Sequence, residues 1–303
     1  MTFTTQVKDE VTKIPQNYIE NLSELAAIVR YDAVITSKKI TITLENASVA
    51  RRIYISFKTI FQVNPKIIIR KQKRFKVDTL YILEVSNKVE KIKERLSLNS
   101  SFYNLIETDE EKIAFLRGCF LACGSISDPK KGSYHFELVF KTFSEANLIK
   151  NALKSLNFDA KSIKRSNKYM VYLKSSEDIS DFLKLLKANN ALFYFEDIRI
   201  YRDHKNMVNR LNNCEIANQE KTISTGLKQL SQINYLKEND LFDLLDEKAQ
   251  IVADYRLKYP DVSFTELSDI ISLETDYKIG RSGINHNFIK IKKLVDNHQN
   301  RNK

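Results

Sequence analysis

Apolar positions along the chain follow a helical period in some segments and a strand period in others, and these segments occur in a regular order. Residues 21–31 have the spacing of an apolar helix, and residues 33–36 and 39–44 have that of short strands. An amphipathic helix over 48–61, strands over 66–70 and 77–85, and a helix over 87–96 follow. The predicted order is helix, two strands, helix, two strands, helix.

The same order begins again at residue 109. The pattern predicts a helix over 109–123, strands near 125–127 and 134–140, a helix over 144–156 that starts at Ser144, strands over 160–165 and 169–174, and a helix over 176–187 with Ser176 as its capping residue. A repeated element order indicates two similar halves. We therefore predict an α+β domain over residues 1–200, with halves at about 18–98 and 109–188.

One stretch, residues 112–140, suggests how the halves meet. Ala114, Gly118 and Ala122 are four residues apart on an apolar helix, and such a small face lets another helix approach closely. A buried core helix would explain this stripe without any special role. Superposing 115–126 on 24–35 places Gly118 on Ala27, which favours packing of the two halves through their first helices.

The last third of the chain has a different composition. Residues 191–201 are apolar and aromatic and could close the second half, whereas residues 201–238 are polar and predict a linker helix. Residues 239–303 predict an all-α domain with a helix over 241–259 that Pro260 ends, a helix from a Ser263–Glu266 capping box to about 272, and a helix over 281–296. Three short helices of which the last is basic are typical of a helix-turn-helix, here at about 263–296.

Composition excludes several classes. The chain has 303 residues, 43% hydrophobic and 29% charged, and no apolar run of about 18 residues that would span a membrane. The first residues lack the apolar centre of a signal peptide, and three cysteines cannot form a full disulfide framework, so we expect a cytoplasmic protein. The four histidines are scattered, and no Cys/His group has zinc spacing, so neither a metal nor a cofactor is predicted.

The net charge of +11 points to a polyanionic partner. Nine basic residues and no acid occur between residues 51 and 76, namely Arg51, Arg52, Lys58, Lys66, Arg70, Lys71, Lys73, Arg74 and Lys76. The equivalent hairpin of the second half has Lys161, Lys164, Arg165 and Lys168. Two basic hairpins at equivalent places predict a saddle for duplex phosphates, while solvated charged loops are the alternative.

The predicted third helix of the C-terminal domain carries the stronger signal. Its polar residues and those just before it are Lys278, Arg281, Ser282, Asn285, His286, Asn287, Lys290 and Lys293. Arginine reads guanine and asparagine reads adenine in the major groove, and Arg281 and Asn285 lie near the helix start, where such contacts are made. We predict a recognition helix for double-stranded DNA, with a small protein-interaction domain as the alternative.

The residues at the ends of the two equivalent helices indicate whether the chain could act as a nuclease. A metal-dependent nuclease built on paired helices needs an acidic residue at the end of each to hold Mg²⁺. The superposition gives Asp32 at one end and Cys123 at the other, and a thiol is a poor ligand for Mg²⁺.

Three motifs together resemble the WhiA family of bacterial sporulation regulators. They are FLRGCFLACGSISDPKKGSYHFELVF, DHKNMVNRLNNCEIANQEKT and GRSGINHNFIKIKKL, and the middle one has Asn209, Arg210, Leu211, Asn213, Cys214, Glu215, Ala217 and Asn218 as the family has them. The resemblance covers nearly the whole chain. One departure is Gly280, where the family usually has the Ser or Thr that would cap the recognition helix.

The resemblance implies a degenerate LAGLIDADG homing-endonuclease-like domain, a linker helix, and a helix-turn-helix like region 4 of sigma factors. It implies a nucleoid-associated, non-nucleolytic DNA-binding regulator of transcription in cell division and chromosome segregation, and it leaves protein partners open. The reader would be the helix-turn-helix, supported by the basic hairpins at Arg70, Lys71, Lys73, Arg74, Lys76, Lys164, Arg165 and Lys168. Two alternatives are a Mg²⁺-dependent endonuclease using Asp32, and a division scaffold that binds no DNA.

Overall fold

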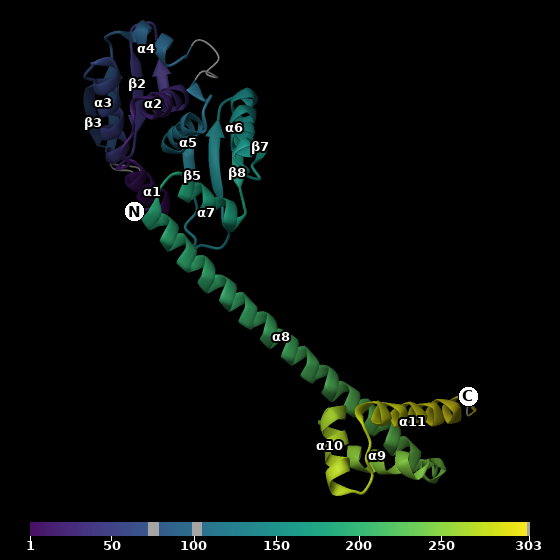
Figure 1. The fold of residues 1–303 in the computed structure, drawn as a ribbon. Helices are drawn as coiled ribbons and strands as arrows, with labels where there is room; N and C mark the ends of the chain where they lie inside the picture. The colour runs from purple at the N-terminus through teal and green to yellow at the C-terminus, as the bar shows by residue number, and fades with distance from the viewer. Residues whose placement is uncertain (72–78, 99–104, 302–303) are drawn as a thin grey trace. The chain divides into compact units, whose positions relative to one another are not determined.

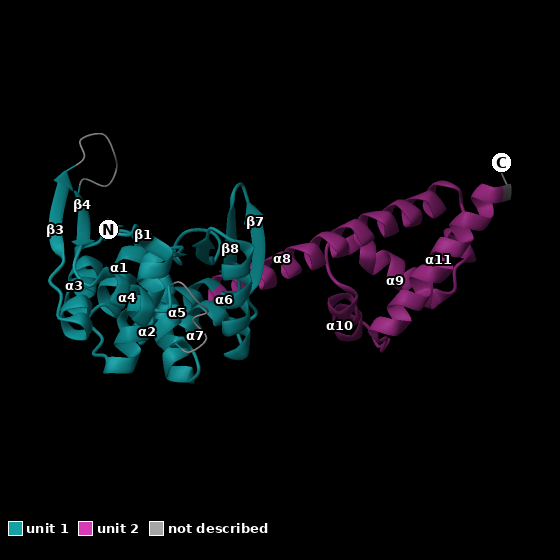
Figure 2. Cartoon of the chain, turned by 90° about the horizontal axis from the view of Figure 1, so that it is seen from above, with its two compact units in different colours: residues 1–202 teal, residues 203–303 magenta. Residues whose placement is uncertain are grey.

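The chain forms two compact units, residues 1–202 and 203–303 (Figure 2). This computed structural model describes residues 1–71, 79–98 and 105–301. The first unit is mixed α and β, and the second is helical, which confirms the predicted α+β class. Among the described residues, no helix is long and apolar enough to cross a membrane.

The first half of unit 1 contains one antiparallel sheet with helices packed on it. Its elements are α1 (Phe3–Val11), α2 (Tyr18–Asp32), β1 (Ala33–Ile35), β2 (Ile40–Leu44), α3 (Ala47–Phe61), β3 (Lys66–Lys71), β4 (Thr79–Val85) and α4 (Val89–Arg95). The strand order in the sheet is β1-β2-β4-β3. All three strand pairs are antiparallel.

The second half repeats this arrangement (Figure 1). Its elements are α5 (Asp109–Cys123), β5 (Gly124–Ile126), β6 (Phe136–Phe140), α6 (Phe143–Ser155), β7 (Lys161–Arg165), β8 (Lys168–Leu173) and α7 (Ser176–Leu185). The strand order β5-β6-β8-β7 matches that of the first sheet strand for strand. The predicted duplication is therefore confirmed, and one continuous apolar core joins both halves.

Two predicted helix starts were wrong by one or two residues. Thr142, rather than Ser144, caps α6, because its hydroxyl accepts from the amide of Glu145 while the Glu145 carboxylate accepts from the amide of Thr142. Ser175, rather than Ser176, caps α7, with the amides of Glu177 and Asp178 donating to its hydroxyl.

The first helices of the halves, α2 and α5, pack closely, as the small stripe predicted. A Cβ at Gly118 would lie 2.4 Å from the carbonyl oxygen of Glu24 and 2.8 Å from the Cβ of Ala27. Real Cβ atoms do not approach so closely, so this crossing requires a glycine on α5. Gly118 therefore marks the contact between the two halves.

Three charged side chains are buried beside this contact. Glu24 and Arg117 are each 1% exposed, and Arg52 of α3 is 8% exposed. The Glu24 carboxylate accepts from the Nε atoms of Arg117 and Arg52, both at 2.5 Å. Both guanidiniums pair with Glu24, and Arg117 also lies 4.0 Å from the Glu20 carboxylate, so acidic partners offset their loss of hydration.

The apolar residues 191–201 are the first part of α8 (Asn189–Glu238), a single helix of 50 residues. Glu10 of α1 caps it, since the amides of Asn190 and Ala191 donate to the Glu10 carboxylate at 2.7 and 3.0 Å. Ala191 and Phe195 are buried in the core of unit 1. The stretch thus closes the second half as a helix that continues directly into the polar segment predicted to be a linker.

Unit 2 consists of the last turns of α8 followed by α9 (Glu247–Lys258), α10 (Phe264–Glu274) and α11 (Arg281–Arg301). The helix predicted from residue 241 begins later, at Glu247. Residues Phe242–Leu244 form a 3-10 turn, and the Asp246 side chain caps α9. The Ser263–Glu266 capping box of α10 is present as predicted.

A buried arginine holds the core of unit 2 together. Arg256 is 2% exposed, and its guanidinium donates to the carbonyls of Tyr259, Pro260 and Val262. It also lies 5.8 and 5.6 Å from the ring centroids of Phe264 and Phe288. Arg256 therefore ties the end of α9 to α10 and α11.

Candidate nucleic-acid interface

Helix α11 presents one face to the core and another to solvent. Ile284, Phe288, Ile291 and Val295 are at most 4% exposed and pack against α9 and α10. The exposed face, which we call the reading face, carries Arg281, Ser282, Asn285, His286, Ile289, Lys292 and Lys293. These side chains follow the i, i+3, i+4 and i+7 spacing of a single stripe, as a helix lying in a groove requires.

Two of the sequence-predicted residues do not lie on the reading face. Asn287 is 5% exposed, and its amide donates to the carbonyl of Gly283 at 3.1 Å, because its position on the helix turns it toward the core. Lys290 bonds to the Asp246 carboxylate at 2.6 Å, and this contact holds the pKa of Asp246 below its usual range. Lys290 therefore links α11 to the start of α9.

The turn that precedes α11 leads into the helix without a side chain that caps it. The amide of Ile284 donates to the carbonyl of Gly280, so the helix begins directly after this glycine. Ile279 is buried, and a Cβ at Gly283 would lie 2.7 Å from its side chain, so Gly283 allows the turn to close on the helix. Lys278, before the turn ends, is exposed.

The predicted contact residues leave out two members of the reading face, although the sequence already placed Lys292 on the basic face of this helix. Ile289 is 44% exposed in the middle of this face, where an apolar side chain can contact a thymine methyl group. Lys292 is exposed beside Lys293, and lysine side chains on such a helix can contact phosphate groups. The helical spacing predicts both positions, because Ile289 lies four residues and Lys292 seven residues after Asn285.

The sheets of unit 1 offer a second basic surface, their outer face, which is opposite the packed helices. Strand register places Lys66, Arg70, Lys161, Arg165 and Lys168 on this face. It also carries the acids Glu84 and Glu137 and the apolar residues Val34, Ile68, Ile82, Val139, Ile163 and Met170. The outer face is thus basic at its two ends and more apolar between them.

Several predicted basic residues lie elsewhere. Lys71 and Lys164 alternate to the other side of their strands, and the Lys164 ammonium lies 5.7 Å from the centroid of the Tyr169 ring. Arg52 is buried against Glu24 and cannot reach a ligand in solvent. Lys73, Arg74 and Lys76 lie outside the described residues.

The ends of α2 and α5 line a cleft of about 1080 Å³, together with α1, the start of α3 and β5. Burial raises the pKa of the Asp32 carboxyl to about 6, against the opposing effect of Lys8 and Lys141. Burial also raises the pKa of the Cys123 thiol to about 12, and that thiol donates to the carbonyl of Cys119. Cys123 is therefore a neutral thiol at neutral pH.

Helix α1, which the sequence reasoning passed over, brings a cation into this cleft. The Lys8 ammonium donates to the carbonyl of Leu121 at 3.0 Å, in the last turn of α5, and Asp32 and Cys123 are near enough to affect its pKa. The i, i+4, i+8 spacing of Phe3, Val7 and Val11, all buried, was the signal for this helix. Among the described residues, no group of three or more His, Cys, Asp and Glu side chains has the arrangement of a metal site.

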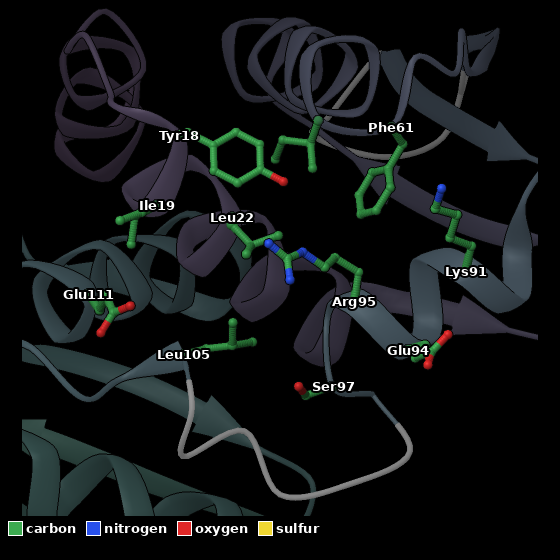
Figure 3. A pocket seen from close by; sticks show the side chains of 11 residues that line it. Tyr18, Ile19, Leu22, Phe61, Lys91, Glu94, Arg95, Ser97, Leu105 and Glu111 are labelled. Carbon is green, nitrogen blue, oxygen red and sulfur yellow. The ribbon is translucent and has the colours of Figure 1, made fainter.

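A further hollow of about 680 Å³ lies at the opposite end of α2. Figure 3 shows Tyr18, Phe61 and Arg95 around it, with Glu94 and Glu111 at its margin. The residues that line it include neither cysteine nor histidine.

Comparisons with known proteins agree with this architecture. Residues 19–99 match the model of the WhiA N-terminal LAGLIDADG-like domain, residues 112–205 the WhiA LAGLIDADG-like domain, and residues 208–295 the WhiA C-terminal HTH domain. The chain is 35% identical to the probable cell division protein WhiA of Oceanobacillus iheyensis, over 98% of this chain and 97% of that protein. It is 36% identical to that of Exiguobacterium sibiricum, over 99% and 98%.

A solved structure is similar over the same extent. The crystal structure of full-length WhiA from Thermotoga maritima covers 98% of this chain, and 99% of that chain is matched, with 25% sequence identity and a TM-score of 0.59. The likeness therefore includes both units rather than one domain alone.

Proposed function

This chain belongs to the WhiA family, and on that premise we propose that it is a cytoplasmic, nucleoid-associated regulator of transcription in cell division and chromosome segregation. The relatives named above are called probable cell division proteins, and their C-terminal HTH domain corresponds to unit 2. The observation that carries the proposal is the reading face of α11, a stripe of Arg281, Asn285 and His286 with lysines at its far end. Acidic residues of unit 2 lie mainly on the preceding elements, so positive charge gathers on the helix that would enter the groove.

Arg281 and Asn285 are the proposed base-reading residues. Arg281→Ala and Asn285→Ala should each weaken binding to the preferred sequence by about 1–3 kcal/mol and relax its preference, because a lost bidentate contact leaves a base edge unread. Genome-wide mapping of bound DNA with the full-length protein first defines the preferred sequence, and fluorescence anisotropy at fixed salt then measures the variants.

Asn297→Ala is the matched control, since Asn297 is an exposed asparagine of the same helix that lies twelve residues after Asn285, near the C-terminal end of α11. This variant should keep both affinity and sequence preference. Unchanged affinity and preference in the Arg281 and Asn285 variants would remove the reading face from the proposed function.

The competing function, Mg²⁺-dependent DNA cleavage, has less support. A divalent cation between the helix ends would meet the Lys8 ammonium, the Asp32 carboxylate and a neutral thiol at Cys123. The other two carboxylates that line the cleft, Glu45 and Asp128, lie after β2 and β5 rather than at a helix end. Hard cations bind oxygen ligands and are repelled by a fixed ammonium. We therefore propose that the LAGLIDADG-like unit is retained without nuclease activity.

Supercoiled plasmid incubated with the protein and Mg²⁺ should stay supercoiled. Nicking that Asp32→Ala abolishes would overturn this part of the proposal and favour the endonuclease. A protein that binds no duplex even at low salt would instead favour a division scaffold.

A further inference from the structure

The middle of α8 is a helix without the support that helices of its composition need. Residues Asp203–Thr222, all described, are exposed except for Thr222, and none of them forms an ion pair. Five of these residues are asparagines, which have low helix propensity. A helix of about 20 residues in water is marginal without tertiary contacts, so this segment calls for a packing partner.

A seam with a period of 3.5 residues runs along this part of α8, and exposed apolar side chains occupy several of its positions. Positions 200, 204, 207, 211, 214 and 218 alternate in steps of four and three and carry Ile200, His204, Met207, Leu211, Cys214 and Asn218. Ile200, Met207 and Leu211 are 62%, 58% and 59% exposed. This is the a/d pattern of a coiled coil, with Ile200, Met207 and Cys214 at d and Leu211 and Asn218 at a.

The residues beside the seam specify the partner. Arg210 takes position g and Glu215 takes the following position e. They are five residues apart, so they do not face each other on one helix. In a parallel pair of identical helices, g of one helix lies beside the next e of the other, which places Arg210 against Glu215 of the second copy. An antiparallel pair would bring g to g and e to e, and so would set like charges together.

Asn218 supports the same orientation. An asparagine at an a position pairs best with its own equivalent across a parallel, in-register dimer. We propose that α8 is the dimerisation element of this protein, joining two copies through a parallel coiled coil over Ile200–Asn218. This pairing does not depend on DNA binding, and it would give one assembly two reading faces.

Sedimentation velocity of the full-length protein over a range of concentrations tests the proposal. The protein should associate to a dimer, and Leu211→Asp should weaken the self-association by about tenfold or more. Ile216→Asp is the matched control, because Ile216 is 54% exposed at position f, on the opposite side of the same helix, and this variant should dimerise as the original does. Circular dichroism checks that both variants remain folded.

Two measurements test the parallel register. A short bis-maleimide reagent should cross-link the dimer through Cys214, which is exposed, and Cys214→Ser should abolish the cross-link. Arg210→Glu should weaken the dimer, and the double variant Arg210→Glu/Glu215→Arg should restore it.

A protein that remains monomeric at high concentration, or a dimer that Leu211→Asp and Ile216→Asp affect equally, would overturn the seam. A dimer without a Cys214 cross-link and without charge-swap rescue would overturn the parallel pairing.

Discussion

At Asp32, burial and the neighbouring cations act in opposite directions on one carboxyl group. Burial raises its pKa to about 6, and Lys8 and Lys141 only partly offset that effect. The folded protein therefore binds a proton at Asp32 more tightly than the unfolded chain does, and its stability falls as the pH rises from about 4 to about 6. Above that window the folded state retains a carboxylate that is poorly hydrated.

We expect Asp32→Asn to raise the free energy of unfolding by about 1–2 kcal/mol at pH 7.5, after allowance for partial exposure of the group. The gain should vanish near pH 3, where the carboxyl is protonated in both the folded and the unfolded state. Urea unfolding at both pH values measures it, with Asp296→Asn, at an exposed carboxylate, as the control. An equal gain at both pH values would contradict the assignment to ionisation.

Single residues were the least predictable level of the site. The run of basic residues from 51 to 76 was evident in the sequence, but only the packed structure reveals that Arg52 forms a buried ion pair with Glu24. In the sequence Asn287 is indistinguishable from the polar residues around it, but its position on the helix turns its side chain toward the core. A signal for the buried cluster did exist, since Arg117 interrupts an otherwise apolar helix and so needs an acidic partner.

At the scale of elements, the crossing of α2 and α5 rests on the absence of one methyl group. The Glu24 carbonyl and the Ala27 side chain occupy the space that a Cβ on residue 118 would need. Both belong to a buried helix, so neither can move without separating the halves. The four-residue spacing was enough to predict this contact, because small faces have few other uses in a core helix.

Gly118→Ala should destabilise unit 1 by about 1–3 kcal/mol, since overpacking forces the two helices apart. Thermal unfolding followed by circular dichroism measures the loss. Gly280→Ala is the control for the same substitution, because a Cβ there meets no atom within 4 Å. Equal stability of the two variants would show that the helices accommodate the methyl group.

Helix boundaries were predicted less well than helix existence. Sequence treated residues 191–201 and 201–238 as separate because one is aromatic and the other is amide-rich. No proline lies between residues 189 and 238, and the backbone continues through Gly226 as one helix. Composition changed where the surroundings of α8 changed, from the core of unit 1 to solvent.

At the scale of the whole molecule, the net charge of +11 is shared between two surfaces. The reading face lies on unit 2, and the basic ends of the outer face lie on unit 1. If both contact one duplex, each phosphate contact adds to the salt dependence of binding. The sequence predicted this division, although strand register decided which side chains share a face.

The triple variant Lys161→Ala/Arg165→Ala/Lys168→Ala should flatten the plot of log affinity against log salt by about 0.9 for each phosphate contact removed. Binding titrations from low to physiological salt measure the slope. Lys164→Ala is the matched control, because Lys164 lies on the other side of β7 and should leave the slope unchanged. A slope that the triple variant does not alter would exclude this basic end of the outer face from DNA contact.

The buried ion cluster at the α2–α5 crossing also makes the two halves of unit 1 chemically different. Superposition of the repeats sets Glu24 on Phe115 and Arg117 on Ala26, so the acid has no counterpart in the second half and the base has none in the first. A first half paired with a copy of itself would bury two carboxylates without this guanidinium, and a second half paired with itself would bury two guanidiniums without this acid. The two halves are therefore no longer equivalent: Glu24 also pairs with Arg52 of its own half, but the Arg117 guanidinium takes its buried acidic partner from the other half.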